Sequence, residues 1–343
     1  MRKLLNTLYV TKPDVYIGAK GETLVVRSEE KKEIQIPIIN LESVVVFGYR
    51  GVSPEAMELC VDHGVTIVFL SPSGKFKARV TGMTKGNVYL RKTQYRWSDS
   101  ESHSLRLAKR FVLSKLANAR VSLMRSLRDH GEKLDRPRLE VACKDLANYA
   151  SMIGKCESLD ELRGLEGLAA RKYFSVLSEQ VLVNKEFFQI SGRVKRPPTD
   201  RLNALLSFLY TLLASDITHA LESVGLDPQI GFLHRDRPGR NSLALDLMEE
   251  FRIFLADRLA LSLINRRQLQ PDDFLQKETG AYILKEDARK TVLTEWQLRK
   301  REELRHPFID EKVPIGLLPY VQSLLLARHM RGDLDDYPPF VAK

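Results

Sequence analysis

Short hydrophobic segments fill the first quarter of the chain. They predict seven β-strands separated by Gly, Pro, Asn and Ser clusters, at residues 4–10, 15–17, 23–27, 34–38, 44–47, 65–70 and 76–80. One helix interrupts the strands, because Ser53 can cap it, Pro54 suits its first position and Gly64 follows its end. Residues 1–81 therefore predict a small β domain. Its short loops carry no clustered acids, so its expected role is packing and dimerisation.

The hydrophobic pattern changes after Trp97. The polar sequence SDSES falls at the end of a predicted linker, residues 82–101. Apolar residues then recur every three to four positions and indicate a long amphipathic helix over 102–130, ending at Gly131. Its predicted buried side is formed by Leu105, Ala108, Val112, Leu116, Ala119 and Leu123. Residues 102–343 predict a larger, all-helical domain, which makes the fold class α+β. Within it, residues 274–296 predict a short strand or turn that leads into another helix.

The long helix carries far more basic than acidic residues outside this stripe: Arg106, Lys109, Arg110, Lys115, Arg120, Arg125 and Arg128. Such residues either form a solvated surface or contact phosphates. The whole chain has a net charge of +10 and a pI near 9.4. That excess favours a polyanionic partner, nucleic acid before an anionic membrane surface.

Composition limits the class of protein further. With 343 residues, 43% hydrophobic and 29% charged, the chain has the size and balance of a soluble two-domain protein, and no membrane span is expected. The apolar run in the N-terminal segment MRKLLNTLYV is too short for a signal peptide. Three distant cysteines without CxxC spacing argue against zinc knuckles and disulfide scaffolds. The expected location is the cytoplasm.

Candidate chemistry concentrates in residues 231–252, GFLHRDRPGRNSLALDLMEEFR. Pro238 and Gly239 predict a reverse turn, after which Asn241 or Ser242 can cap a helix. Along that helix a buried stripe is predicted at Ala244, Leu247, Met248, Phe251 and Leu255.

Three acids, Asp246, Glu249 and Glu250, are predicted to share the opposite face of this helix. Carboxylates at these spacings repel one another unless a cation lies among them. A metal ion, with His234 folding back across the turn, is one such cation. A solvated acidic surface is the alternative that the local pattern leaves open.

A further acid, Glu166, lies between Gly164 and Gly167 in a helix that begins at Ser158. Each glycine inside a helix costs about 1 kcal/mol relative to alanine, so a compensating reason is expected. Close approach of another backbone or a ligand beside Glu166 is one reason, and tight helix packing is the other.

A basic loop precedes the apolar helix predicted over 201–221. Its prolines, Pro197 and Pro198, exclude a helix interior. The loop suits a nucleic-acid backbone, with a solvated linker as the alternative. The predicted nucleic-acid-binding residues, in this loop and in the turn after His234, are Arg193, Lys195, Arg196, Arg237 and Arg240.

Several motifs occur in a characteristic order after a β-rich N-terminal third: GLEG with Glu166, RPPTD followed by NALLSFLY, GFLH, DLMEEFR, and a closing tail with RGD, Y and PF. Over nearly its whole length, the chain closely resembles the CRISPR-associated integrase and endonuclease family Cas1. By length and tail it is similar to the form found in subtype I-C systems.

This resemblance implies a homodimer joined through the β domain, and a helical domain with one divalent ion, Mg²⁺ or Mn²⁺, per active site. It also implies assembly with a small ferredoxin-like partner, Cas2, on double-stranded DNA. The family's catalytic metal ligands correspond to Glu166, His234 and Glu249, although many relatives have aspartate at the last position. Asp246 and Glu250 are left as substitutes or supporting carboxylates.

The implied reaction is insertion of foreign DNA fragments into a repeat array, by attack of a 3′-hydroxyl on a phosphodiester. We expect a transesterification without a covalent enzyme intermediate, because no Ser, Tyr or Cys near this site has an obvious activating base. Two alternatives stay open: a stand-alone metal-dependent nuclease of DNA repair, and a non-catalytic nucleic-acid-binding protein.

Overall fold

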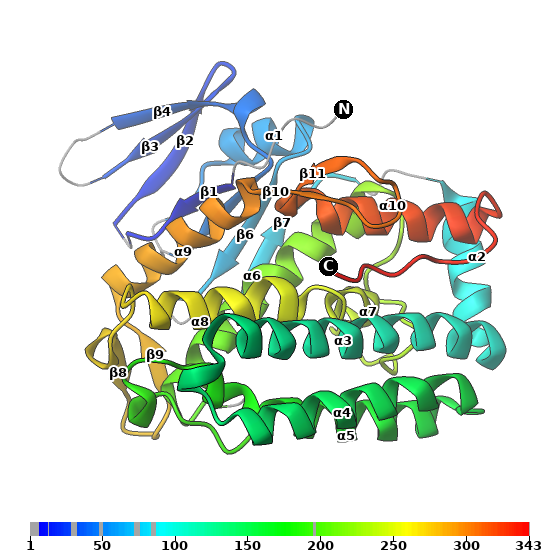
Figure 1. Cartoon of the computed structure of the whole chain (residues 1–343). Coiled ribbons are helices and arrows are strands. Elements are labelled where there is room, and N and C mark those ends of the chain that lie inside the picture. Colours follow the sequence, from blue (N-terminus) through cyan, green and yellow to red (C-terminus); the bar gives the residue numbers. More distant parts are fainter. Residues whose placement is uncertain are drawn as a thin grey trace. The chain divides into compact units, whose positions relative to one another are not determined.

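The computed structural model describes residues 7–12, 14–28, 33–47, 51–71, 76–83, 87–194 and 197–342. By its internal contacts the chain divides into two units, residues 1–84 with 286–302 and residues 85–285 with 303–343. The first unit is rich in β-strands and the second is mostly helical (Figure 1). The predicted α+β fold class is therefore confirmed.

The first unit contains two sheets. In the four-stranded sheet, the order is β1-β5-β6-β7, with β7 antiparallel and the other pairs parallel. The three-stranded sheet is an antiparallel meander, β2-β3-β4. The strands are β1 Thr7–Val10, β2 Tyr16–Lys20, β3 Thr23–Arg27, β4 Glu33–Pro37, β5 Ser43–Val46, β6 Thr66–Leu70 and β7 Phe76–Val80. All seven predicted strands are thus present, while residues 4–6 lie outside the described part.

Helix α1, Pro54–Asp62, crosses between β5 and β6 as its end signals predict. Ser53 Oγ accepts a hydrogen bond from Ala56 N at 3.1 Å, and Gly64 follows the helix with φ +69°. The core of this unit is aliphatic, with Leu24, Ile38 and Ile67 almost fully buried.

Helix α9, Glu286–Arg301, also belongs to the first unit, although the sequence placed it in the C-terminal domain. The predicted linker is different too, because residues 88–99 form helix α2, Val88–Asp99, within the second unit. Chain order alone carries no signal for either assignment, since a unit is defined by contacts between segments distant in sequence.

The second unit is built on α3, Glu101–His130, which matches the predicted helix closely. Helices α3, α4 and α5 run side by side and pack on one another (Figure 1). The other helices of this unit are α4 Arg136–Met152, α5 Leu159–Leu177, α6 Arg201–Ser223, α7 Ser242–Met248, α8 Arg258–Asn265 and α10 Leu318–Arg331.

The prediction that this region is entirely helical was wrong in one respect. It contains two short antiparallel hairpins, β8 Phe274–Gln276 with β9 Tyr282–Leu284, and β10 Glu303–Arg305 with β11 Lys312–Pro314. The first hairpin falls where a short strand or turn was predicted, within residues 274–296. The second was missed, because three-residue strands are too short to show a period of two.

Helix α6 is the predicted apolar helix. By length and composition alone it is apolar enough to cross a membrane, but 67% of its most apolar window is buried within the protein. Leu205, Leu209 and Leu213 have no exposed surface. The prediction that these leucines form core is confirmed.

The C-terminal tail packs against the second unit. Helix α10 ends at Gly332, whose φ of +83° is the left-handed conformation typical of a helix C-cap. In the following segment Tyr337 and Phe340 are buried. The tail up to Ala342 is therefore packed against this unit.

Candidate active site

Asp246, in α7, fixes the segment that carries His234. Its Oδ2 accepts hydrogen bonds from the backbone N–H groups of Phe232 at 2.6 Å and Leu233 at 2.9 Å. Its Oδ1 accepts from His234 N at 3.0 Å and lies 2.6 Å from His234 Nδ1. Because a carboxylate only accepts, Nδ1 carries the ring proton and donates it, which leaves Nε2 as the nitrogen for a ligand.

Gly231 permits this close approach between the GFLH segment and α7. A Cβ at this position would lie 2.7 Å from Ser242 Cβ and 2.9 Å from Asp246 Oδ2, distances too short for any side chain. The turn between the two segments is also as predicted, because Gly239 has a φ of +71°.

Glu166 is placed by α5, which begins at Ser158. Ser158 Oγ accepts from Glu161 N at 3.2 Å, as the capping signal predicts. One turn before Glu166, Arg163 Nε donates to the Leu233 carbonyl at 2.7 Å. Helix α5 therefore positions both Glu166 and the segment that ends in His234.

The glycines on either side of Glu166 are not explained by packing. A Cβ on Gly164 or Gly167 would meet no described atom within 4 Å. Both the predicted close approach of another backbone and the alternative of tight helix packing are therefore wrong. The surface of α5 beside Glu166 is open.

Lys115 of α3 joins the two predicted catalytic glutamates. Its buried ammonium contacts Glu166 Oε1 directly and lies 2.7 Å from Glu249 Oε2. On the other side, Arg252 Nη2 lies 3.0 Å from Glu249 Oε1. Burial opposes ionisation of Glu249, but Arg252, Lys115 and His234 outweigh it and lower its pKa to about 2. Glu249 is therefore an anion held between two cations.

The sequence assigned Lys115 to the solvated or phosphate-contacting face of α3, and this assignment was wrong. A signal was available, because Phe111 lies four residues before Lys115 and Asn118 three residues after it, and both are buried. The predicted buried stripe followed Val112 and Leu116 and so missed this second, partly polar buried row.

Asp246, Glu249 and Glu250 do not share one face, contrary to the prediction. Helix α7 ends at Met248, and Glu249 N and Glu250 N donate to carbonyls three residues earlier, those of Asp246 at 3.2 Å and Leu247 at 3.2 Å. The backbone then passes into a π-helical turn, Arg252–Asp257. Because the helical period changes here, the three acids point to three different neighbourhoods, and all three are buried.

Glu250 belongs to the C-terminal tail rather than to the Lys115 cluster. Its Oε1 accepts from Tyr337 Oη at 2.6 Å, and its Oε2 accepts from Phe340 N at 2.8 Å and Gln322 Nε2 at 2.9 Å. Burial raises the pKa of Glu250 to about 8, and these hydrogen bonds offset only part of that rise. The structure does not bring Glu250 together with Glu166 and His234.

Arg252 extends the charged network behind Glu249. Its guanidinium lies 4.8 Å from the centre of the Tyr210 ring, whose hydroxyl donates to Asp257 at 2.6 Å. Burial raises the pKa of Asp257 to about 6 despite that hydrogen bond and the nearby arginine. Asp257 is therefore a buried carboxyl group and not part of a solvated acidic surface.

The predicted nucleic-acid-binding residues lie in different environments in the structure. Arg193 makes internal contacts, donating to Asn203 Oδ1 at 2.7 Å and Ser207 Oγ at 2.9 Å. Arg237 is exposed and Arg240 partly exposed in the turn that follows His234. Lys195 and Arg196 lie outside the described residues. DNA contact by the set stays a prediction.

The three predicted ligands have the right chemistry for Mg²⁺ or Mn²⁺, namely two carboxylates and one imidazole. Glu249 Oε2 is buried and accepts no hydrogen bond of normal geometry from the described part of the chain. Within that same part, no three His, Cys, Asp or Glu side chains are already arranged around a common metal position. The Lys115 ammonium lies between two of the three ligands, which accounts for this arrangement.

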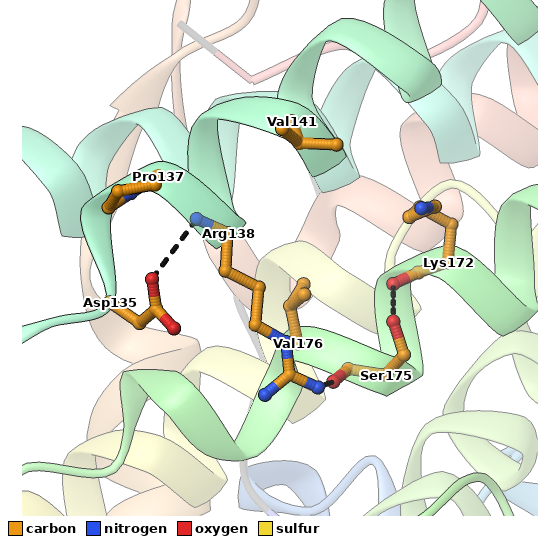
Figure 2. A pocket seen from close by; sticks show the side chains of 7 residues that line it. All are labelled: Asp135, Pro137, Arg138, Val141, Lys172, Ser175 and Val176. Atoms are coloured by element: carbon orange, nitrogen blue, oxygen red, sulfur yellow. Dashed lines mark hydrogen bonds between the residues drawn. The ribbon is translucent and has the colours of Figure 1, made fainter.

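A surface pocket of about 420 Å³ lies elsewhere, where α4 faces α5. Figure 2 shows its polar side chains bonded locally, with Arg138 donating to the Ser175 carbonyl and Ser175 Oγ donating to the Lys172 carbonyl. Arg138 also pairs with Glu179, and Lys172 pairs with Asp145 at 2.7 Å. These internal pairings leave little polar capacity for a ligand, and none of the predicted site residues line the pocket.

One buried and one partly buried glutamate, with a histidine whose other nitrogen is fixed by an aspartate, are typical of enzymes that act on phosphodiesters with a bound cation. The surrounding architecture is a β-rich unit followed by a helical one. The chain belongs to the Cas1 family, because the family model described as CRISPR associated protein Cas1 matches residues 8–298.

Curated relatives match over the full length. The chain is 48% identical to the CRISPR-associated endonuclease Cas1 1 of Chlorobaculum tepidum, over 99% of both chains. It is 51% identical to the CRISPR-associated endonuclease Cas1 2 of Rhodospirillum rubrum, over 100% of both. The family predicted from the sequence is confirmed, and the predicted function, in CRISPR adaptation, is confirmed at the level of that family.

Solved structures agree on the fold. A Cas1 protein from Thermotoga maritima superposes with a TM-score of 0.81 at 22% identity, covering 98% of this chain and 100% of that one. A casposase bound to integration product gives a TM-score of 0.85 at 23% identity, covering 97% and 93%. At these identities the likeness concerns the fold alone.

Proposed function

We propose that this chain is a divalent-metal-dependent DNA endonuclease and integrase of CRISPR adaptation, which inserts foreign DNA fragments into a repeat array. The observation that carries the proposal is the convergence of Glu166 and Glu249 on one cationic group. The ring of His234, the third ligand of the family, is held by Asp246 in the same unit. Glu166, His234 and Glu249 would hold the ion.

The protein's own residues have distinct roles in this proposal. A bound Mg²⁺ or Mn²⁺ would neutralise charge on the scissile phosphate and favour loss of the proton from the attacking hydroxyl. Asp246 keeps the His234 proton on Nδ1, so Nε2 has its lone pair free. Arg252 keeps Glu249 anionic and in place. One imidazole among oxygen ligands shifts the metal preference of the site from Mg²⁺ toward Mn²⁺.

Direct attack of the DNA hydroxyl or of water, without a covalent enzyme intermediate, suits the contacts of the local side chains. Ser242, which lies between His234 and Glu249 in sequence, donates to the Arg235 carbonyl at 3.2 Å rather than to a base. Tyr210 donates to Asp257 behind the site, and burial raises its pKa well above the usual value.

The proposal extends to partners and location. We place double-stranded DNA on the basic surface that includes Arg237 and Arg240. The first unit joins two copies into a homodimer, a small ferredoxin-like Cas2 protein is the assembly partner, and the complex acts in the cytoplasm. A Cas6-RT-Cas1–Cas2 complex among the solved structures with this fold supports such an assembly. Assignment to subtype I-C rests on chain length and tail, and the neighbouring genes test it.

The site assignment is tested by comparing Glu166→Ala and His234→Ala with Glu140→Ala, a change at an exposed position of α4. Cleavage of branched DNA, strand transfer and DNA binding are measured separately, with Mn²⁺ and with excess EDTA. Glu166→Ala and His234→Ala should abolish both reactions and leave salt-dependent binding intact, because that binding depends on Lys and Arg contacts with phosphate.

Wild-type strand transfer by either site variant contradicts the assignment, as does full activity in EDTA. Loss of both reactions in Glu140→Ala as well would show that the assay responds to changes unrelated to the site. A repeat array and a Cas2 gene beside this gene separate the proposal from a nuclease that acts alone in DNA repair.

A further inference from the structure

Lys115 has an unusual position for a lysine. Its side chain is 6% exposed, and its ammonium contacts both Glu166 and Glu249, the two carboxylates proposed to hold the metal ion. Helix α3 supplies it, whereas α5 supplies Glu166 and Glu249 follows α7. Long-range packing therefore brings one positive charge to the place where the two glutamates meet.

The charges of this cluster balance without any added ion. Lys115 and Arg252 supply two positive charges, and Glu166 and Glu249 supply two negative charges. The buried Asp246 carboxylate, which accepts from His234, adds one negative charge beside the site, so a divalent cation added between the glutamates would leave one excess positive charge in a largely buried place. Uncompensated buried charge is strongly unfavourable, so one protein cation has to lose its contacts when the metal ion binds.

Of the two protein cations, Lys115 is the one able to move. Arg252 is bound on two sides, by Glu249 Oε1 at 3.0 Å and by the Tyr210 ring at 4.8 Å. Lys115 is a point charge at the end of a flexible four-carbon chain, and its contacts in the cluster are with the two carboxylates. Those carboxylates are the ones that the metal ion needs.

We propose that Lys115 is an exchangeable counter-ion of the metal site: its ammonium holds Glu166 and Glu249 together in the metal-free protein, and a divalent cation displaces it. Lys115 then acts as a positioning residue that sets the affinity of the site for the cation. This inference rests on the proposed function, because it takes Glu166 and Glu249 as metal ligands.

Isothermal titration calorimetry of the purified full-length protein with Mn²⁺, in the absence of DNA, tests whether the cation displaces Lys115. Lys115→Met removes the competing charge at similar side-chain length, and the Mn²⁺ dissociation constant should fall about tenfold or more, the equivalent of about 1.4 kcal/mol. Lys115→Arg keeps the charge and adds a second hydrogen bond to a carboxylate, so its Mn²⁺ affinity should fall below that of the wild type.

Lys172→Met is the matched control, because Lys172 forms a 2.7 Å ion pair with Asp145 in the same unit but away from the site. Its Mn²⁺ affinity should equal that of the wild type. Lys115→Met lacks the ion pairs with Glu166 and Glu249, so its stability without Mn²⁺ can differ from that of the wild type. For this reason, the rise in melting temperature on adding Mn²⁺ is measured as well as the calorimetric affinity. This rise should be larger in Lys115→Met than in the wild type.

The outcomes separate this inference from the proposed function. Mn²⁺ binding that is absent in the wild type, or unchanged in Glu166→Ala, contradicts the metal site itself. Binding that depends on Glu166 but is no tighter in Lys115→Met, or no weaker in Lys115→Arg, overturns the role of Lys115 and leaves the metal site standing.

Discussion

Glu249 and Glu250 are adjacent in sequence and equally buried, yet they serve two different regions of the second unit. Glu249 lies on an open, cationic side with Lys115 and Arg252, and its pKa is lowered to about 2. Glu250 lies on a closed side, among the uncharged groups of Gln322 and the C-terminal tail, and its pKa is raised to about 8. On the open side, Glu166 and His234 are 25% and 24% exposed.

This difference shows that burial alone does not decide what a carboxylate does. Both groups lose their water, which raises the pKa of each. Two nearby cations reverse that effect at Glu249, whereas three uncharged donors do not reverse it at Glu250. The first environment keeps Glu249 anionic, as the proposed metal site requires, and the second uses a neutral carboxyl group as a structural link to the tail.

The largest expected effect is a difference in enzymatic activity between variants of Glu249 and variants of Glu250. Glu249→Gln removes the anion at constant shape, and we expect strand transfer and branched-DNA cleavage to fall on the order of 10²–10³-fold, as for loss of one electrostatic group in an active site. Glu250→Gln should keep wild-type activity, because a neutral side chain already occupies that position at neutral pH. If Glu249→Gln and Glu250→Gln lost activity equally, the two glutamates would not differ in their roles.

The next effect concerns stability on the closed side. Glu250→Ala leaves Tyr337 Oη and Phe340 N without their buried acceptor, whereas Gln322 Nε2 keeps Tyr337 Oη and the Pro338 carbonyl. We expect the free energy of unfolding in urea to fall by about 3 kcal/mol, since each unsatisfied buried group costs about 1–3 kcal/mol. Glu140→Ala, at an exposed position, should change it little. A loss no larger than that of Glu140→Ala would mean that the tail is not held through Glu250.

Much of the fold is predictable because its signals are local. Strand β3, helix α1 with its Ser53 cap, and helices α3 and α6 all occur where periodicity and end signals place them. The membership of α9 in the first unit is not predictable in this way, because it depends on contacts between distant segments. Three-residue strands such as β10 carry too few residues to show a pattern.

The site was predictable in part. His234 and the acids are recognisable from one stretch, and Glu166 required the family resemblance, because its flanking glycines suggested packing. Asp246 was predicted as a substitute or a supporting carboxylate, and it contacts His234 in the second of these ways. The role of Lys115 was not predictable, since it depends on packing of α3. The helical period also changes after Met248, which no local propensity indicated.

The pH dependence of stability tests the same contrast through the slope of the unfolding free energy with pH. The pKa of Glu250 is about 8 in the folded state against an ordinary 4.5, so the folded state keeps this proton to a higher pH than the unfolded state does. The stability that this proton contributes is complete below pH 4.5 and is lost as the pH rises through about 8, with a slope of at most about 1.4 kcal/mol per pH unit.

Urea unfolding of wild type and Glu250→Gln from pH 5 to 9 isolates this contribution. The raised pKa of Asp257, about 6, acts in the same direction but is common to both proteins, so it cancels in the difference. The wild type should lose stability relative to Glu250→Gln as the pH rises. Parallel curves would show that Glu250 is ionised throughout, like Glu249.

The smallest effect tests whether the side that carries Glu166 is open. A Cβ on Gly164 would meet no described atom within 4 Å, so Gly164→Ala should raise the free energy of unfolding by about 0.5–1 kcal/mol through the lower entropy of the unfolded chain. Gly231→Ala is the comparison variant with the opposite expected effect. Its Cβ would lie 2.7 Å from Ser242 Cβ, so the free energy of unfolding should fall. If Gly164→Ala destabilises too, the surface beside Glu166 is closed by protein, and the contrast with the Glu250 side fails. If Gly164→Ala stabilises the fold but weakens strand transfer, the open surface is where DNA lies, and the helix keeps a less stable residue for that contact.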